Sequence, residues 1–143
     1  MLIGGGGFIG RALTQRFLNS GNTVITWCIG KSVSASPDDV HIVNDFLQRS
    51  AHEQDALLMD IDIVFYLASN TTPSTGATDL AHEIETNLLP FARYLTALVR
   101  QPNLRLIYLS SGGSIYDPVN PLPATENAAL CAQSCYALSL IHI

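Results

Sequence analysis

The sequence predicts an α/β fold with a doubly wound parallel sheet, and three observations lead to this prediction. Short apolar stretches alternate along the chain with segments whose apolar residues recur at helical spacing. The stretch IDIVFYLA at 61–68 is largely apolar, which is typical of a strand buried on both faces of a parallel sheet. A glycine-rich turn joins the first apolar stretch to the first helical segment. Strands that alternate with helices form right-handed βαβ units, so these strands are expected to run parallel.

The predicted elements follow one another without an internal repeat. The first helical segment ends at Ser20-Gly21, because glycine is the usual residue just past a helix C-terminus. In chain order we expect a very short strand at 1–3, a helix after the glycines, strands at 23–28 and 40–43, a helix at 48–58, a strand at 61–68, a helix at 84–98 and a second buried strand at 104–109.

The helix expected at 84–98 contains a proline. Pro90 has no backbone N–H and its ring clashes with the preceding turn, so it is expected to kink this helix or delay its start. The predicted apolar face of the helix consists of Ile84, Leu88, Phe91, Leu95 and Leu98.

The composition is that of one domain with few charges. The 143 residues correspond to about one domain and are enough to bury a core. Charged residues make up 13% of the chain, against about 25% in typical soluble domains. We therefore expect more chain or a partner subunit to cover part of the surface, and a homodimer is one candidate assembly.

Charge, hydropathy and cysteine usage argue against several classes of protein. The net charge is -5 and the basic residues are scattered, which argues against a nucleic-acid-binding surface. No apolar run reaches the roughly 18 residues of a membrane span, and no secretory signal is visible at the N-terminus. The three cysteines and four histidines lack metal-ligand spacing, so no metal site is expected. The odd cysteine count fits reduced thiols in the cytoplasm.

The strongest local signal is the glycine run before the first helix. Gly4, Gly7 and Gly10 form the pattern G-x-x-G-x-x-G. Such glycines allow a tight turn, a close approach of the backbone to a pyrophosphate, and close packing of the helix on the strand. The helix N-terminus then offers free N–H groups and a positive dipole end to the phosphates. The pattern predicts a Rossmann-type dinucleotide site, and a glycine-rich turn without a ligand is the alternative.

The choice between NAD and NADP stays open at this point. An acidic residue roughly 20 positions after the glycines would bind the ribose hydroxyls of NAD. No acidic residue precedes Asp38 in this chain. Lys31, after the second strand, could meet the 2′-phosphate of NADP, or it could be a solvated loop lysine.

Five stretches of the chain carry a resemblance to a known family. They are IGGGGFIG at 3–10, NDF at 44–46, DIVFYLAS at 62–69, ETNLL at 85–89 and LSSGGSIYD at 109–117. In this order they resemble the N-terminal half of the extended short-chain dehydrogenase/reductases, specifically the NAD-dependent epimerase/dehydratases of nucleotide sugars. The resemblance implies an incomplete Rossmann-type sheet without the C-terminal substrate part. It also implies NAD as cofactor, with NADP as the alternative, and a nucleotide-sugar substrate for the full-length parent.

The resemblance assigns cofactor-binding roles to three groups of residues. The glycine turn includes Phe8 and Ile9, which open the helix at the phosphates. Asp45 resembles the residue that contacts the adenine, with Phe46 beside it, although Asp45 could instead cap the helix that follows. The side of the cofactor that carries the ribose and nicotinamide is expected to be lined by Leu67, Ala68 and Ser69.

The resemblance also assigns four catalytic candidates. Tyr136 resembles the tyrosine of a Y-x-x-x-K motif, and Asn87 resembles the asparagine that supports the active site. Gly112 stands where many members carry a catalytic Ser or Thr, so Ser111 or Ser114 is expected to supply the hydroxyl. The alternatives are that Asn87 lies on a helix surface and that Tyr136 is an ordinary tyrosine.

The mechanism implied by the resemblance requires a lysine that the chain lacks. A tyrosine with its usual pKa of about 10 is a poor base at neutral pH, and a nearby ammonium favours the phenolate. Residue 140 is leucine, and Lys31 is the only lysine of the chain. We therefore expect no turnover from this chain by itself. The alternatives to an epimerase/dehydratase parent are a reductase of another small carbonyl substrate and a non-catalytic dinucleotide-binding module.

The last six residues are expected to be foreign to the protein. LSLIHI at 138–143 is what CTGTCTCTTATACACATC encodes, and this DNA resembles a transposon-end adapter from sequencing libraries. We therefore expect a dinucleotide-binding domain at 1–137 and a non-native tail at 138–143. The alternative is a genuine ending, in a degenerate relative of the family that is kept as a cofactor-binding or partner-binding module.

Overall fold

A computed structural model describes residues 1–28, 40–42, 45–72, 74 and 79–143. They form two compact units, one of Met1–Ala68 with Arg93–Leu109 and one of Ser69–Ala92 with Ser110–Ile143. In these parts of the chain, no helix combines the length and the apolar character that crossing a membrane requires. The predicted division into a domain at 1–137 and a tail at 138–143 stays a prediction, and residues 138–142 continue the last helix.

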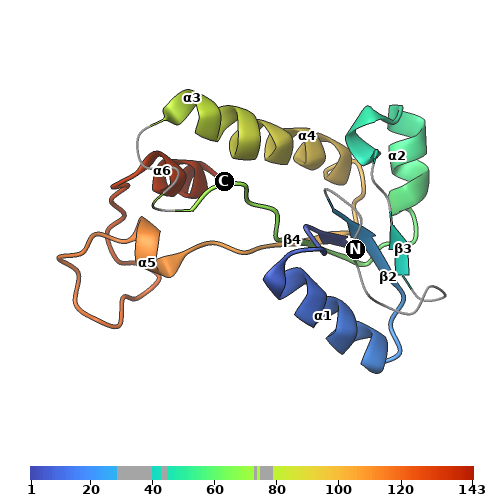
Figure 1. Ribbon diagram of the computed structural model, residues 1–143, viewed down its shortest axis with the longest axis horizontal. Coiled ribbons are helices and arrows are strands. Elements are labelled where there is room, and N and C mark those ends of the chain that lie inside the picture. The colour runs from blue at the N-terminus through green and yellow to red at the C-terminus, as the bar shows by residue number, and fades with distance from the viewer. Residues whose placement is uncertain (29–39, 43–44, 73, 75–78) are drawn as a thin grey trace. The chain divides into compact units, whose positions relative to one another are not determined.

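The first unit is built around a five-stranded sheet (Figure 1). Its strands are β1 (Leu2–Ile3), β2 (Val24–Trp27), β3 (Val40–Ile42), β4 (Ile63–Tyr66) and β5 (Arg105–Tyr108). They lie in the order β3-β2-β1-β4-β5, and every neighbouring pair is parallel. The chain starts in the middle of the sheet and winds outward first in one direction and then in the other. This order is that of the Rossmann fold, and it confirms the predicted fold class.

Helices cover both faces of this sheet. Phe17 of α1 (Phe8–Asn19) packs on one face, with its ring centroid 5.2 Å from that of Phe65. Tyr94 of α4 (Leu89–Leu98) packs on the other, with its ring 5.8 Å from that of Tyr66. Phe65 and Tyr66 are consecutive in β4, and consecutive strand residues point to opposite faces. The sheet is therefore doubly wound.

An aromatic cluster around Tyr94 forms part of the core of the first unit. Tyr94 is 1% exposed and stacks on Phe46, with centroids 5.2 Å apart and planes 12° from parallel. Its ring edge also meets Trp27 at 5.5 Å. Burial raises the pKa of the hydroxyls of Tyr66 and Tyr94 well above the usual value. The Tyr94 hydroxyl is buried and has no hydrogen-bond partner among the described residues.

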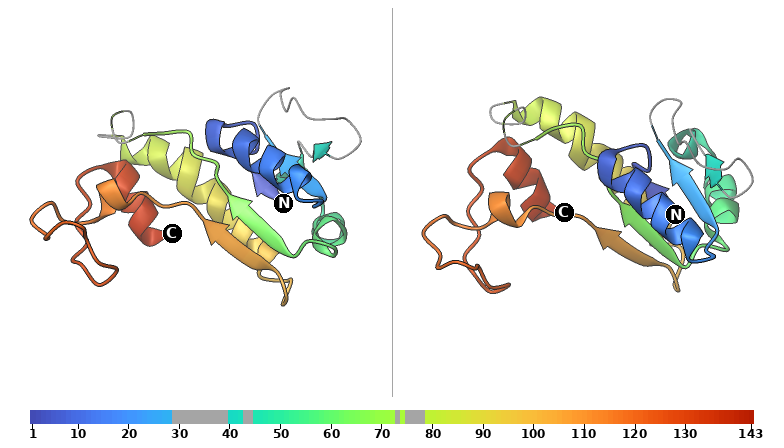
Figure 2. Two further views of the ribbon diagram at one scale, coloured as in Figure 1. Left: turned by 90° about the horizontal axis from the view of Figure 1, so that it is seen from below. Right: turned by 60° about the horizontal axis from the view of Figure 1, so that its bottom comes forward.

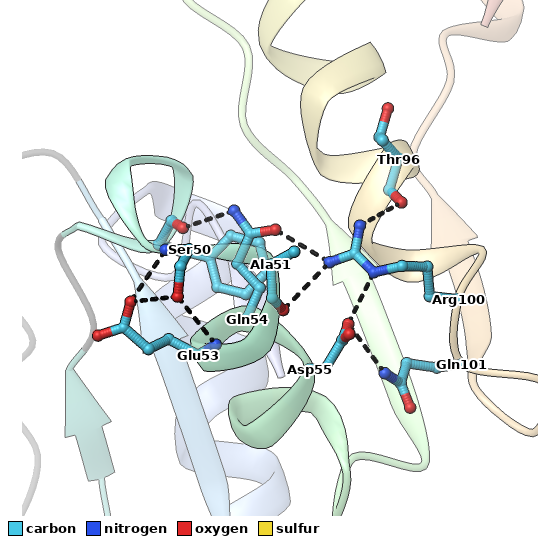
Figure 3. A network of polar contacts seen from close by, with 9 residues as sticks. Ser50, Ala51, Glu53, Gln54, Asp55, Thr96, Arg100 and Gln101 are labelled. Atoms are coloured by element: carbon cyan, nitrogen blue, oxygen red, sulfur yellow. Dashed lines mark hydrogen bonds and ion pairs between the residues drawn. The ribbon is translucent and has the colours of Figure 1, made fainter.

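Helix α2 (Ala51–Leu58) begins three residues later than predicted because Ser50 caps it. The Ser50 hydroxyl accepts from the Glu53 N–H, and the Glu53 carboxylate accepts from the Ser50 N–H at 2.9 Å. The residues before this cap form a separate 3₁₀ turn, η1 (Phe46–Gln48). Arg100 joins the end of α4 to α2, since its guanidinium donates to Asp55 at 2.8 Å and to Gln54 at 3.1 Å (Figure 3).

The prediction of a second strand buried on both faces is wrong for β5. Among the described residues, this strand lies at the edge of the sheet and pairs with β4 alone (Figure 2). Its residues alternate between exposed and half-buried, and Ile107 is 41% exposed. The apolar stretch itself does not reveal whether anything covers both faces of the strand.

The second unit contains one long helix with an internal irregularity. α3 (Leu80–Glu83), the π-helical turn η2 (Ile84–Leu88) and the start of α4 follow one another without a break. Pro90 follows the π-helical turn, and the carbonyl of Thr86, four residues earlier, accepts from the Asn70 side chain at 3.1 Å. The helix starts at Leu80, so Pro90 does not delay it, and the distortion takes the form of the π-helical turn.

The prediction of an apolar face on this helix is partly wrong. Ile84 is 40% exposed, whereas Glu83 and Asn87 are buried. The π-helical turn adds a residue to one turn and shifts the later side chains around the axis, so Phe91 and Leu98 are buried as predicted.

Two shorter helices complete the second unit. α5 (Gly112–Ile115) and α6 (Cys135–His142) pack against each other, and α6 also packs against α3 and η2. Between them, residues 115–117 pair with 129–131 by backbone hydrogen bonds.

Candidate functional site

The glycine turn of the first unit is closed so tightly that side chains do not fit. Gly4 has a φ of +92°, which is a left-handed conformation that suits glycine. A Cβ on Gly4 would lie 2.8 Å from the Ala68 nitrogen. A Cβ on Gly10 would lie 2.6 Å from the Cα of Gly5, within the turn itself. The turn therefore has the shape that the sequence pattern predicts.

The N-terminus of α1 is open to solvent. Gly7 occupies the N-cap position, and no side chain caps the helix. The first N–H groups of a helix have no partner within the helix, and they carry the positive end of its dipole. Phe8 is 87% exposed and Ile9 is 48% exposed, so the N-terminus lies at the surface of this unit. The arrangement is suited to hold an anion such as a pyrophosphate.

Asp45 and Phe46 lie at the start of η1 and differ in their surroundings. Asp45 occupies the N-cap position of η1, but its side chain makes no capping hydrogen bond. The alternative that this side chain caps the helix by a hydrogen bond is therefore wrong. Its carboxylate instead accepts from Arg49 at 2.9 Å and stays exposed. Phe46 is fully buried and stacks on Tyr94, which leaves only its backbone for a ligand. Lys31 lies outside the described residues.

The segment after β4 is divided between the two units. Leu67 and Ala68 are half-buried in the first unit, and the Leu67 N–H donates to the Ile3 carbonyl at 2.8 Å. Ser69 opens the second unit, is exposed, and donates its hydroxyl to the Thr71 carbonyl at 2.9 Å. The roles of these residues toward a cofactor stay predictions.

Asn87 is buried in the second unit, so the alternative of a helix-surface residue is wrong. Its amide nitrogen donates to the Thr71 hydroxyl at 2.7 Å and to Glu83 at 2.9 Å. Its amide oxygen accepts from the Asn70 N–H at 2.8 Å. The oxygen and one amide hydrogen hold the loop at 69–71 against the helix, and the other amide hydrogen bonds Glu83 within the helix.

Glu83 stands at the centre of this polar cluster, and sequence reasoning missed it. Its side chain is fully buried and accepts from Thr71 at 2.6 Å and from Ser139 at 2.7 Å, in addition to Asn87. One signal for it was present, because Glu83 and Asn87 are four residues apart and share a helix face. Nothing in the sequence pattern indicates Thr71 or Ser139 as their partners.

The serine segment at 111–114 and helix α6, which carries Tyr136, meet within the second unit. Ser111 precedes α5 and donates its hydroxyl to that of Ser114 at 3.1 Å, across Gly112. Tyr136 is half-buried in the first turn of α6, which Ser134 caps by accepting from the Ala137 N–H at 3.1 Å. Because α6 packs on α5, α3 and η2, the segments that carry the four catalytic candidates come together.

A cavity of about 450 Å³ lies beside the serine segment in the second unit. Its polar lining includes Ser114, Asp117, Asn120 and Gln133. Asp117 stands where the resembling family usually has glycine, and its carboxylate accepts from the Val119 N–H at 3.0 Å. The cavity has the volume and the hydrogen-bonding groups to hold a small polar molecule. In the described parts of the chain, no three His, Cys, Asp or Glu side chains gather as metal ligands would.

The chain is similar to known proteins in sequence and in fold. A family model described as "NAD dependent epimerase/dehydratase family" matches residues 1–143. A curated relative from Methanocaldococcus jannaschii, provisionally named a UDP-glucose 4-epimerase, is 21% identical over 143 residues, which are 97% of this chain and 46% of the relative.

Two solved structures show the same fold. One is the UDP-glucose 4-epimerase of Thermotoga maritima with UDP-glucose, with a TM-score of 0.81 and 20% identity over 99% of this chain and 47% of that chain. The other is the UDP-glucose 4-epimerase of Thermus thermophilus in complex with NAD, with a TM-score of 0.81 and 24% identity over 99% of this chain and 47% of that chain. The chain spans slightly less than half the length of each of these proteins.

Proposed function

Because the chain belongs to the NAD dependent epimerase/dehydratase family, we propose that it is the dinucleotide-binding half of a nucleotide-sugar epimerase or dehydratase. We further propose that this half binds NAD, or NADP in its place, and does not turn over sugars by itself. The parent enzyme would act in the cytoplasm on a nucleotide sugar.

The closed glycine turn is the observation that carries this proposal. The turn leaves no space for a Cβ at Gly4 or Gly10, and it delivers the uncapped N-terminus of α1 to the surface. A pyrophosphate fits such a cradle, because backbone N–H groups can approach it without side chains in between. Gly4, Gly7 and Gly10 would hold the pyrophosphate, and Asp45 would have to exchange part of its contact with Arg49 for the adenine.

The residues of the second unit supply the proposed chemistry toward the sugar. When bound, a nicotinamide dinucleotide would supply the hydride-transfer chemistry. Tyr136 would take the proton of the sugar hydroxyl, and Ser114 or Ser111 would orient the reacting oxygen by a hydrogen bond. Asn87 would act through the loop at 69–71, because its own hydrogen-bonding groups are all engaged.

The missing lysine is the reason to expect binding without turnover. Leu140 takes the place of the lysine of the Y-x-x-x-K motif, and it is 8% exposed. The lysine of this motif supplies an ammonium that favours the phenolate form of a tyrosine, and a leucine side chain cannot supply one. This feature also favours the second candidate function, a dinucleotide-binding module without catalysis.

Titration of the chain with NADH and with NADPH, followed by nicotinamide fluorescence, tests the proposal. We expect saturable binding of one of them. We expect at least roughly fivefold weaker binding by Gly10→Ala, because the turn must shift to make room for the Cβ and such overpacking costs about 1–3 kcal/mol. Gly113→Ala is the matched control, because a Cβ at Gly113 meets nothing within 4 Å. A folded chain that binds neither dinucleotide would refute the proposal. Epimerisation of UDP-glucose by the chain would refute the need for the lysine.

A further inference from the structure

Glu83 is the only acidic or basic side chain that is fully buried among the described residues. Burying a carboxylate costs considerable free energy unless hydrogen bonds or an opposite charge compensate for it. No basic side chain in the described ranges pairs with Glu83. Within the part of the chain that the structure describes, its hydrogen-bond donors are therefore all neutral. An apolar residue of similar size would fill the same space without needing these donors.

The three donors come from three separate segments of the second unit. Thr71 lies in the loop after β4, Asn87 lies in η2, and Ser139 lies in α6. The donors and acceptors are mutually consistent, because the Thr71 hydroxyl donates to Glu83 and accepts from Asn87. The Glu83 carboxylate thus links the loop at 69–71, the π-helical turn η2 and helix α6.

The link to α6 reaches the backbone of Tyr136. Ser139 lies three residues after Tyr136. Its hydroxyl donates to the Glu83 carboxylate at 2.7 Å, and the Tyr136 carbonyl, 2.9 Å away, is a second acceptor for the same hydrogen. Residues three apart lie on neighbouring positions of a helix surface. A fixed Ser139 therefore fixes the rotation of α6 about its axis, and this rotation sets the direction in which the Tyr136 side chain leaves the helix.

We propose that Glu83 is a positioning residue of the tyrosine site. It holds α6 by its hydrogen bond to Ser139, and it holds η2 by its hydrogen bond to the Asn87 amide, so that Tyr136 and η2 keep one geometry. The proposal rests on the proposed function for the meaning of Tyr136, and it concerns the present sequence, in which Ser139 lies within the segment 138–143 that is predicted to be foreign. The link itself is a property of the chain without a cofactor. A purely structural Glu83 would contribute to stability and leave the surroundings of Tyr136 unchanged in every folded variant.

Fluorine NMR of the chain labelled with 3-fluorotyrosine separates these two roles. The sequence has five tyrosines, and Tyr136→Phe identifies the resonance of Tyr136. In Glu83→Gln we expect this resonance to move by more than its line width, because an amide nitrogen would then face groups that donate. Glu85→Gln is the matched control, because Glu85 is exposed two residues further along the same helix.

Substitutions at Ser139 test the link from its other end. Ser139→Ala is expected to displace the Tyr136 resonance as Glu83→Gln does. The double variant with both substitutions is expected to show little further displacement. Ser139→Thr keeps the hydroxyl and is expected to restore the original resonance. If Glu83→Gln fails to fold, the Ser139 variants decide. An unchanged Tyr136 resonance in folded Ser139→Ala would overturn the proposal.

The experiment is carried out without dinucleotide, so its result is independent of the proposed function. If the chain binds no dinucleotide but its Tyr136 resonance responds to Glu83→Gln and Ser139→Ala, the proposed function fails and the positioning role stands. If dinucleotide binds and the resonance does not respond, the positioning role fails and the proposed function stands.

Discussion

The surroundings of the Tyr94 hydroxyl predict that removing it raises the free energy of unfolding. The hydroxyl is buried without a partner in the described part of the chain, in a side chain that is 1% exposed. Replacing Tyr94 by Phe removes only this oxygen. The ring contacts to Phe46 at 5.2 Å, Trp27 at 5.5 Å and Tyr66 at 5.8 Å do not involve it and are expected to persist.

The expected size follows from the cost of an unsatisfied buried polar group. Such a group costs about 1–3 kcal/mol, and the vacated space is smaller than a methyl group, so we expect Tyr94→Phe to stabilise the chain by about 1 kcal/mol. For a domain of this size, the change corresponds to a rise in Tm of roughly 3–5 °C. Most substitutions in a core destabilise, which makes this outcome distinctive.

Urea denaturation followed by circular dichroism measures this difference in the free energy of unfolding. An unchanged m-value would show that the two forms expose the same surface on unfolding. Tyr116→Phe serves as the control, since Tyr116 is half-buried outside the aromatic cluster, and we expect a change within about 0.5 kcal/mol. If Tyr94→Phe instead lowers the stability by about 1 kcal/mol or more, the hydroxyl has a partner such as a buried water, and the reasoning is refuted.

Two further predictions concern the first unit. Arg100→Ala removes the 2.8 Å ion pair with Asp55, in which both side chains are about one-third exposed, so we expect a loss of roughly 0.5–1.5 kcal/mol in the same urea assay. The control is Arg93→Ala, which replaces an exposed arginine within α4 and should lower the stability less; equal losses would contradict the assigned contact. Burial lowers the pKa of the Met1 amine to about 6, while the amine donates to the Ile63 carbonyl at 2.7 Å. The folded state then binds fewer protons than the unfolded chain, so stability should be complete above about pH 8 and fall by about 1–2 kcal/mol as the pH drops to about 6. Acetylation of Met1 should remove this pH dependence, and a dependence that persists in the acetylated chain would assign it to other groups.

The glycine turn and the strand pattern were predictable because they depend on neighbours in sequence. Gly4 needs a left-handed φ and Gly10 needs room beside Gly5, and both requirements arise within one turn of the chain. The alternation of strands and helices likewise predicts a parallel sheet with right-handed crossovers. Errors arose where a local pattern depends on distant packing. The sequence pattern predicts that β5 is a buried strand, but β5 lies at the sheet edge. It also predicts that Ile84 is a core residue, but Ile84 is 40% exposed.

The sequence by itself determined the fold class and the dinucleotide-type turn, because glycine geometry and hydrophobic periodicity are local constraints. The tertiary structure alone decided the polar cluster at Glu83. Its partners are 12 residues away at Thr71 and 56 residues away at Ser139, and no spacing rule connects them. A buried carboxylate is tolerated only where donors from other segments reach it, so its position becomes visible only when the chain is folded.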